Sequence, residues 1–144
     1  MYNAPSTDYA PWGDAKAQFA TDMQFRCSAS TIAQWHAAKA PTFEYEFTRA
    51  PEPRGAVHSW ELQYVFGNLK QATEEADRKL SDEVQVYWTN FAKTGNPNGA
   101  GVPVWPKFGS GREYMDLGSP TPVAKAALRA PFCDVWREKL LGSL

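Results

Sequence analysis

The chain has 144 residues, enough for one ordinary domain on the usual size of about 100 to 200 residues. Its 43% apolar and 14% aromatic residues supply a packed core and exclude a mainly disordered chain. Fifteen basic against sixteen acidic side chains leave a formal net charge of −1, so the composition does not favour binding to nucleic acid or to an anionic membrane surface.

The chain reads as one folded unit, residues 1–144, without internal repeats. Residues 1–12 lack hydrophobic periodicity and are expected to form a loosely ordered lead-in. They also lack a basic start followed by an apolar run, so we predict no signal peptide in them. No apolar run approaches the ~20 residues that a membrane-spanning helix needs, and we predict no membrane segment.

Two helices are predicted near the start of the chain. Apolar side chains recur every fourth residue after Asp14, which predicts a helix that breaks near Cys27. A second helix is expected to follow at once, with Ser28 or Ser30 as its N-cap. Pro41 stops this second helix because proline cannot continue it.

Residues 42–48 predict a β-strand. Aromatic side chains at 43, 45 and 47 alternate with polar ones, which is typical of a strand with one buried face. The prolines and glycine of residues 49–55 then end the strand and start a loop.

The strongest helical pattern begins at Thr73, a candidate N-cap, and acidic residues occupy its first turn. Apolar residues recur at spacings of three and four up to Phe91, and Gly95 followed by proline ends the helix. An aromatic loop at 104–108, a short strand at 114–117 and a closing helix at 131–141 complete a mixed α/β pattern of helices with a few short strands.

The chain has two histidines with different surroundings. His36 lies in the second helix with no ligand-type residue three or four positions away, which favours an ordinary surface or boundary histidine. His58 follows the strand and its proline-rich loop, where a scaffold commonly carries catalytic groups. An imidazole there can take a proton from a nucleophile and return it to a leaving group. Its alternative is a structural histidine in a free-standing aromatic-rich domain.

Several catalytic signatures are missing from the chain. No GxxxxGK[ST] loop and no GxSxG elbow are present, so a self-contained serine hydrolase is not encoded in these residues. No sequence feature calls for a metal or organic cofactor. Cys27 and Cys133 are compatible either with one long-range disulfide or with two buried thiols.

The run GAVHSWELQYVFG at 55–67 closely resembles the histidine motif of the type B carboxylesterases, the family of cholinesterases and para-nitrobenzyl esterases. The run YWTNFAKTGNPN at 87–98, followed by Trp105-Pro106, resembles the helix and loop of that family, and YMDLG at 114–118 resembles its last short strand. Because several motifs occur in the family's order over roughly residues 19–140, the resemblance is specific.

The resemblance implies the C-terminal part of an α/β-hydrolase fold, whose triad order along the chain is serine, acid, histidine. It implies His58 as the catalytic general acid/base and Glu61 as a residue that braces the active site rather than the triad acid. The serine, the oxyanion loop and the acid would lie in a part of the parent esterase not present here. The parent would hydrolyse small-molecule carboxylic esters without a cofactor, and this chain alone would be inactive.

Cys27 and Cys133 fall where cholinesterase-like members of the family carry a disulfide. A bridge would favour a periplasmic or secreted parent, whereas two thiols would suit a cytoplasmic one. The alternative function is a catalytically dead, esterase-like binding or adhesion module, which an upstream sequence without a serine elbow would indicate. If the strand at 43–47 lacks the neighbours of the intact fold, the isolated chain is expected to self-associate or to pair with the missing N-terminal portion.

Overall fold

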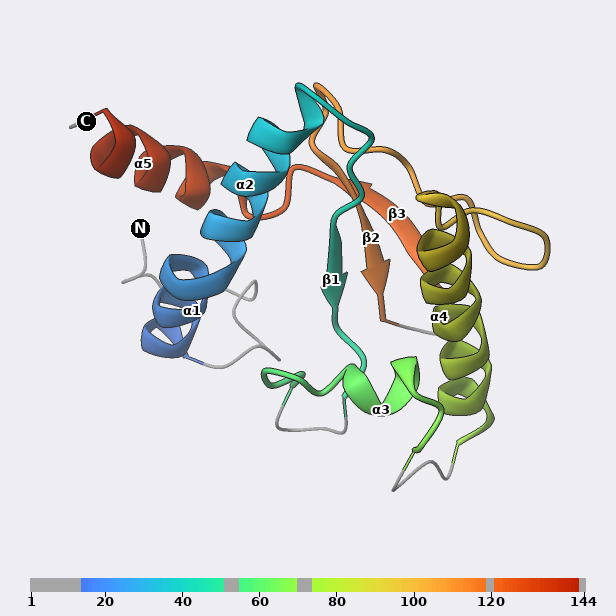
Figure 1. The fold of residues 1–144 in the computed structure, drawn as a ribbon. Helices are drawn as coiled ribbons and strands as arrows, with labels where there is room; N and C mark the ends of the chain where they lie inside the picture. The colour runs from blue at the N-terminus through green and yellow to red at the C-terminus, as the bar shows by residue number, and fades with distance from the viewer. Residues whose placement is uncertain (1–13, 51–54, 70–73, 119–120, 143–144) are drawn as a thin grey trace.

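The computed structural model describes residues 14–50, 55–69, 74–118 and 121–142 (Figure 1). The expected lead-in at 1–12 and the expected cap Thr73 lie outside these residues. The helices and strands, in chain order, are α1 (Ala15–Thr21), the π-helical η2 (Asp22–Arg26), α2 (Cys27–Ala37), β1 (Tyr45–Phe47), α3 (Leu62–Val65), α4 (Glu75–Thr94), β2 (Glu113–Leu117), β3 (Val123–Ala126) and α5 (Ala130–Leu141).

The first two predicted helices form one continuous helical segment. Asp14 caps it, because its Oδ1 accepts a hydrogen bond from the Ala17 amide at 2.8 Å. The predicted break near Cys27 is wrong, since the wider π-helical turn of η2 passes directly into α2. The predicted serine cap is also wrong: the Ser30 hydroxyl donates to the buried Glu44 carboxylate instead.

The three strands of the described residues form one sheet in the order β1-β2-β3. β1 pairs in parallel with β2, with Tyr45 opposite Met115, and β2 pairs antiparallel with β3. β1 is shorter than the predicted strand at 42–48. β3 was not expected, because its four residues are all exposed and carry no alternation of apolar and polar side chains.

Helices cover both faces of the sheet (Figure 1). Met115 and Leu117 of β2 pack against α4 on one face. On the other face, Glu46 of β1 and Glu44 just before the strand meet the first helical segment: Glu44 accepts from Ser30 of α2, and Glu46 accepts from Arg26 of η2. β1 therefore has two covered faces, and the expectation of a single buried face was wrong.

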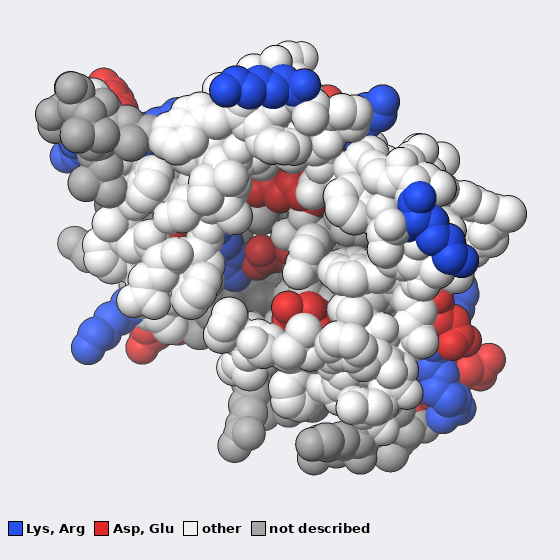
Figure 2. Space-filling view, viewed as in Figure 1, with Lys and Arg blue, Asp and Glu red and all other residues white. Residues whose placement is uncertain are grey.

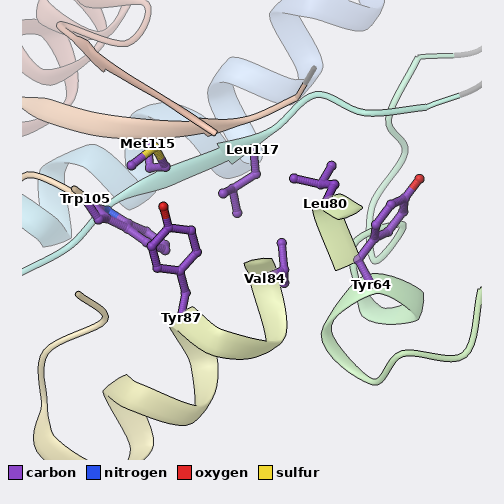
Figure 3. Packing of buried hydrophobic residues seen from close by; sticks show 7 residues of the cluster. All are labelled: Tyr64, Leu80, Val84, Tyr87, Trp105, Met115 and Leu117. Carbon is purple, nitrogen blue, oxygen red and sulfur yellow. The ribbon is translucent and has the colours of Figure 1, made fainter. Parts of the chain in front are cut away.

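The core lies between α4 and β2 (Figure 3). The predicted apolar stripe of α4 is confirmed, because Leu80, Val84 and Tyr87 are all buried. Burying an aliphatic or aromatic side chain contributes roughly 1.5 to 3 kcal/mol, so this face holds α4 on the sheet. Two polar atoms of this cluster have hydrogen-bond partners: Tyr87 Oη donates to the Pro103 carbonyl at 2.7 Å, and Trp105 Nε1 donates to the Glu44 carbonyl at 3.0 Å.

The remaining predicted elements are confirmed. α4 ends at Gly95, whose left-handed φ of 72° favours glycine. The segment 104–108 is a loop that buries Trp105, and β2 and α5 lie at the positions predicted for the last strand and the closing helix. No helix among the described residues is long and apolar enough to cross a membrane.

Candidate active site

His58 lies on an exposed tight turn between β1 and α3. The Trp60 amide donates to the Val57 carbonyl at 3.0 Å and closes this turn. Ser59, the residue after His58, has a left-handed φ of 67°, which is uncommon for a residue other than glycine and is found at functional turns. The turn thus presents the imidazole outward instead of burying it among hydrocarbon side chains.

The His58 turn borders a hollow of about 610 Å³. Residues 44–47, 56–59 and Glu61 line one side, and side chains from α1, η2 and α2 line the other. Figure 2 shows this hollow, with acidic and basic side chains inside it and mainly uncharged side chains around it. Because Glu44 and all three residues of β1 line the hollow in succession, the edge of the strand, and not one of its faces, forms this wall.

The His58 ring stacks on the ring of Phe25 across the hollow. Their centroids are 5.1 Å apart and their planes are inclined by 21°. Phe25 belongs to η2, so the π-helical turn supplies the surface against which the imidazole rests. The sequence provides no signal for this contact, because the two residues are 33 positions apart and Phe25 fits the helical pattern equally well without it.

Glu61 lies three residues after His58, at the start of α3, and lines the same hollow. In the described part of the chain its carboxylate makes no hydrogen bond to the imidazole. The Glu61 charge acts on Tyr45 instead. Burial is the largest cause that raises the pKa of the Tyr45 phenol to about 12, and the negative charges of Glu61 and Glu46 add to it. The structure therefore brings Glu61 and His58 to one site without joining them.

Two further carboxylates, missed by the sequence analysis, lie beside the hollow: Glu44 just before β1 and Glu46 within it. Burial raises the pKa of Glu44, and of its two oxygens Oε1 accepts from Ser30 while Oε2 has no partner among the described residues. Burial also raises the pKa of Glu46, although Arg26 lies only 2.7 Å away and opposes the shift. Burial thus favours the protonated form of both groups.

A disulfide joins Cys27 and Cys133, with a Cα–Cα distance of 4.9 Å. Of the two alternatives left open by composition, the structure contains the bridge. Both cysteines are buried, and the bridge links α2 to α5. No group of three or more His, Cys, Asp or Glu side chains in the described ranges is arranged to hold a metal ion.

The sheet and the helices that cover it form part of an α/β-hydrolase fold. The solved structure of PNB esterase matches this chain with a TM-score of 0.72 and 31% sequence identity, over 81% of this chain and 26% of that one. A sequence profile described as the carboxylesterase family matches residues 1–136. The chain therefore belongs to the carboxylesterase family.

Curated relatives agree with this assignment. The chain is 35% identical to cocaine esterase from Homo sapiens and 37% identical to liver carboxylesterase from Sus scrofa, in each case over 83% of this chain and 23% of the relative. Carboxylesterase 1D from Rattus norvegicus is 35% identical over 86% of this chain and 24% of its own length. The chain thus spans about a quarter of the length of these curated relatives.

Proposed function

We propose that this chain carries the general acid/base of a serine carboxylic-ester hydrolase, and that His58 is that residue. The observation that supports the proposal is the exposed imidazole of His58 at the hollow, in a chain of the carboxylesterase family. His58 takes the proton of a serine hydroxyl as the serine attacks the ester carbonyl, and returns it to the departing alcohol. It then activates water, which releases the acid from the acyl-enzyme.

The other catalytic parts come from outside these 144 residues. The sequence contains no GxSxG elbow, and its relatives are about four times longer. The serine, the oxyanion-hole amides and the triad acid are therefore assigned to the remaining part of the protein. Without them the imidazole has no nucleophile to activate, and the chain alone is expected to be inactive.

Glu61 braces this site. Its half-buried carboxylate lies beside the His58 turn and near Tyr45, so it supplies a negative charge close to the imidazolium that forms during the reaction. In this role Glu61 stabilises the site electrostatically without replacing the triad acid.

One edge of β1 pairs with no other strand in the described part of the chain, which supports pairing with another segment of the parent protein. The Met115 amide donates to the Glu44 carbonyl and the Thr48 amide to the Leu117 carbonyl, so Tyr45 and Phe47 turn their backbone groups toward the hollow. We infer that the missing N-terminal portion covers this edge in the intact enzyme, and that free copies of the chain associate through it. The net charge of −1 gives no support to a nucleic-acid or membrane partner.

The buried disulfide supports an oxidising location for the parent enzyme. Such bridges persist in the periplasm or outside the cell and are rare in the cytoplasm. We therefore place the parent protein in the periplasm or among secreted proteins, on the basis of the bridge between Cys27 and Cys133.

A chimera tests the function directly. The part of PNB esterase that precedes its matched region is joined to this chain, and hydrolysis of a p-nitrophenyl ester is measured. His58→Ala is expected to lower kcat by about ten-thousand-fold or more, whereas His36→Ala, a change of the only other histidine, leaves kcat unchanged. Equal activity of the His58→Ala chimera overturns the proposal, and so does ester hydrolysis by the 144-residue chain alone that is lost in His58→Ala.

A further inference from the structure

The chain that carries His58 is closed into a loop by one carboxylate oxygen. Asp77 Oδ1, in the first turn of α4, accepts from Arg49 Nε at 2.6 Å and from Tyr64 Oη at 2.9 Å. Arg49 lies just after β1 and Tyr64 lies in α3, so the two donors flank the segment that contains His58. The two ends of the His58 loop are therefore both hydrogen-bonded to one atom, Asp77 Oδ1, of the helix α4 that packs on the core.

The physical environment makes these contacts strong. The hydrogen bond from Arg49 is the main cause that lowers the pKa of Asp77, and Tyr64 adds to it. The side chains of Asp77 and Arg49 are 14% and 20% exposed, so water competes only weakly for both groups. An acidic residue in the first turn of α4 is also favoured by the helix dipole.

A second contact fixes the exit of the loop. The Ser81 hydroxyl, one turn further along α4, donates to the Tyr64 carbonyl at 2.9 Å in a buried position. Tyr64 is therefore held through its backbone by Ser81 and through its ring by Asp77, whereas Arg49 depends on its side chain alone.

We propose that Asp77 is a positioning residue for His58, which fixes the imidazole against Phe25 by holding both ends of its loop to α4. The catalytic role of His58 in this inference rests on the proposed function. The contacts that hold the loop do not depend on that function. Loss of the charge at Asp77 leaves Arg49 with the exposed Glu74 as its ion-pair partner and weakens the hydrogen bond from Tyr64, and the loop then gains conformations in which the imidazole leaves Phe25. A loop without these contacts presents the imidazole in many orientations, whereas proton transfer requires one particular orientation of the base toward the serine.

The test is NMR on the 144-residue chain, which has only two histidines to assign. In the wild type, nuclear Overhauser contacts are expected between the rings of His58 and Phe25, with a ring-current displacement of the His58 signals. Asp77→Asn is expected to weaken both strongly, and Tyr64→Phe, which removes one hydroxyl, to weaken both to a smaller extent. The His36 signals report on the fold elsewhere, because that ring contacts Thr42 at 2.7 Å, and they are expected to stay unchanged.

Glu74→Gln is the matched control. Glu74 also accepts from Arg49 and lies at the start of α4, but within the described ranges the Tyr64 hydroxyl donates to Asp77 and not to Glu74, and the Glu74 side chain is 66% exposed. The His58 signature is expected to persist in this variant. Its persistence in Asp77→Asn and Tyr64→Phe overturns the inference. If Asp77→Asn also moves the His36 signals and thus perturbs the whole fold, Tyr64→Phe alone decides.

The chimera separates this inference from the proposed function. Asp77→Asn is expected to lower kcat of the chimera with little change in KM, because the substrate-binding surface is untouched while the base is misoriented. If His58→Ala leaves kcat of the chimera unchanged, the proposed function is wrong, whatever the NMR result. If His58→Ala lowers kcat of the chimera but Asp77→Asn does not, only the positioning role of Asp77 is wrong.

Discussion

Asp22 and Arg129 are 107 residues apart in the sequence and form a buried ion pair in the structure. Arg129 Nη2 lies 2.6 Å and Nε 2.9 Å from Asp22 Oδ2, and Arg26 Nη1 lies 3.2 Å from Asp22 Oδ1. The Asp22 carboxylate, 1% exposed, therefore joins η2 to the start of α5. Since η2 also carries Phe25, this pair supports the surface on which His58 rests.

We predict that Asp22→Asn lowers the free energy of unfolding by about 3 kcal/mol, because the neutral amide removes the buried negative charge that Arg129 and Arg26 share. Urea denaturation followed by tryptophan fluorescence measures the loss. Asp134→Asn is the control: Asp134 also binds two arginines, Arg112 and Arg137, but is 45% exposed, so its loss is expected to stay below about 1 kcal/mol. Equal losses in the two variants would contradict the prediction.

Removal of the disulfide is predicted to destabilise the chain strongly. The bridge between Cys27 and Cys133 spans 106 positions, and loop-closure entropy on that scale corresponds to about 4 to 5 kcal/mol of unfolding free energy. Cys27→Ala with Cys133→Ala should show this loss in urea denaturation. Added reductant should bring the wild type to the same stability once the bridge is cleaved in urea. A double variant as stable as the oxidised wild type would refute the prediction.

Local patterns were sufficient for the elements with a one-sided apolar periodicity. The three- and four-residue spacing of α4 and its end at Gly95 could be predicted, because the stripe faces one surface and glycine adopts the left-handed cap. The continuity of α1, η2 and α2 could not, since a π-helical turn leaves no mark on the periodicity and the serines bond elsewhere. β3 was missed because an exposed strand needs no apolar alternation.

The candidate site divides in the same way. His58 stood out because a motif of neighbouring residues surrounds it. The residues that support His58 could not be predicted, because their contacts depend on tertiary structure. Phe25 of η2 stacks on the His58 ring, and Asp77 of α4 binds both ends of the His58 loop. The polar residues of β1 were expected on an open face, and only the packing of η2 and α2 turned Glu44 into a buried carboxyl.

The free energy of unfolding is predicted to fall with rising pH through the titration of Glu44. Burial raises the pKa of this carboxyl above its ordinary 4.5, so the native state binds the proton more tightly than the unfolded chain does. The contribution is fully present below pH 4.5 and is lost as the pH rises through the raised pKa. Asp77 and Asp134 have lowered pKa values, so their contributions to the free energy of unfolding are present above pH 3.8 and are lost as the pH falls below it.

Glu44→Gln isolates this effect. The difference in unfolding free energy, variant minus wild type, should grow in favour of the variant from about pH 4.5 upward and then level off, since glutamine cannot ionise. Urea denaturation of both proteins between pH 4 and pH 8 measures this difference. A difference that is constant over this interval would show that the Glu44 carboxyl does not titrate abnormally.

The open edge of β1 is predicted to make the isolated chain associate. Light scattering at micromolar concentration should give a mass above the 16.1 kDa of one chain. Tyr45→Pro should restore the monomer, because the Tyr45 amide faces the hollow and its removal leaves the ladder to β2 intact. Tyr45→Ala loses the same ring but keeps the amide, and should still associate. A wild type that scatters as a single chain, or an alanine variant as monomeric as the proline variant, would locate the association elsewhere than in the backbone of this strand.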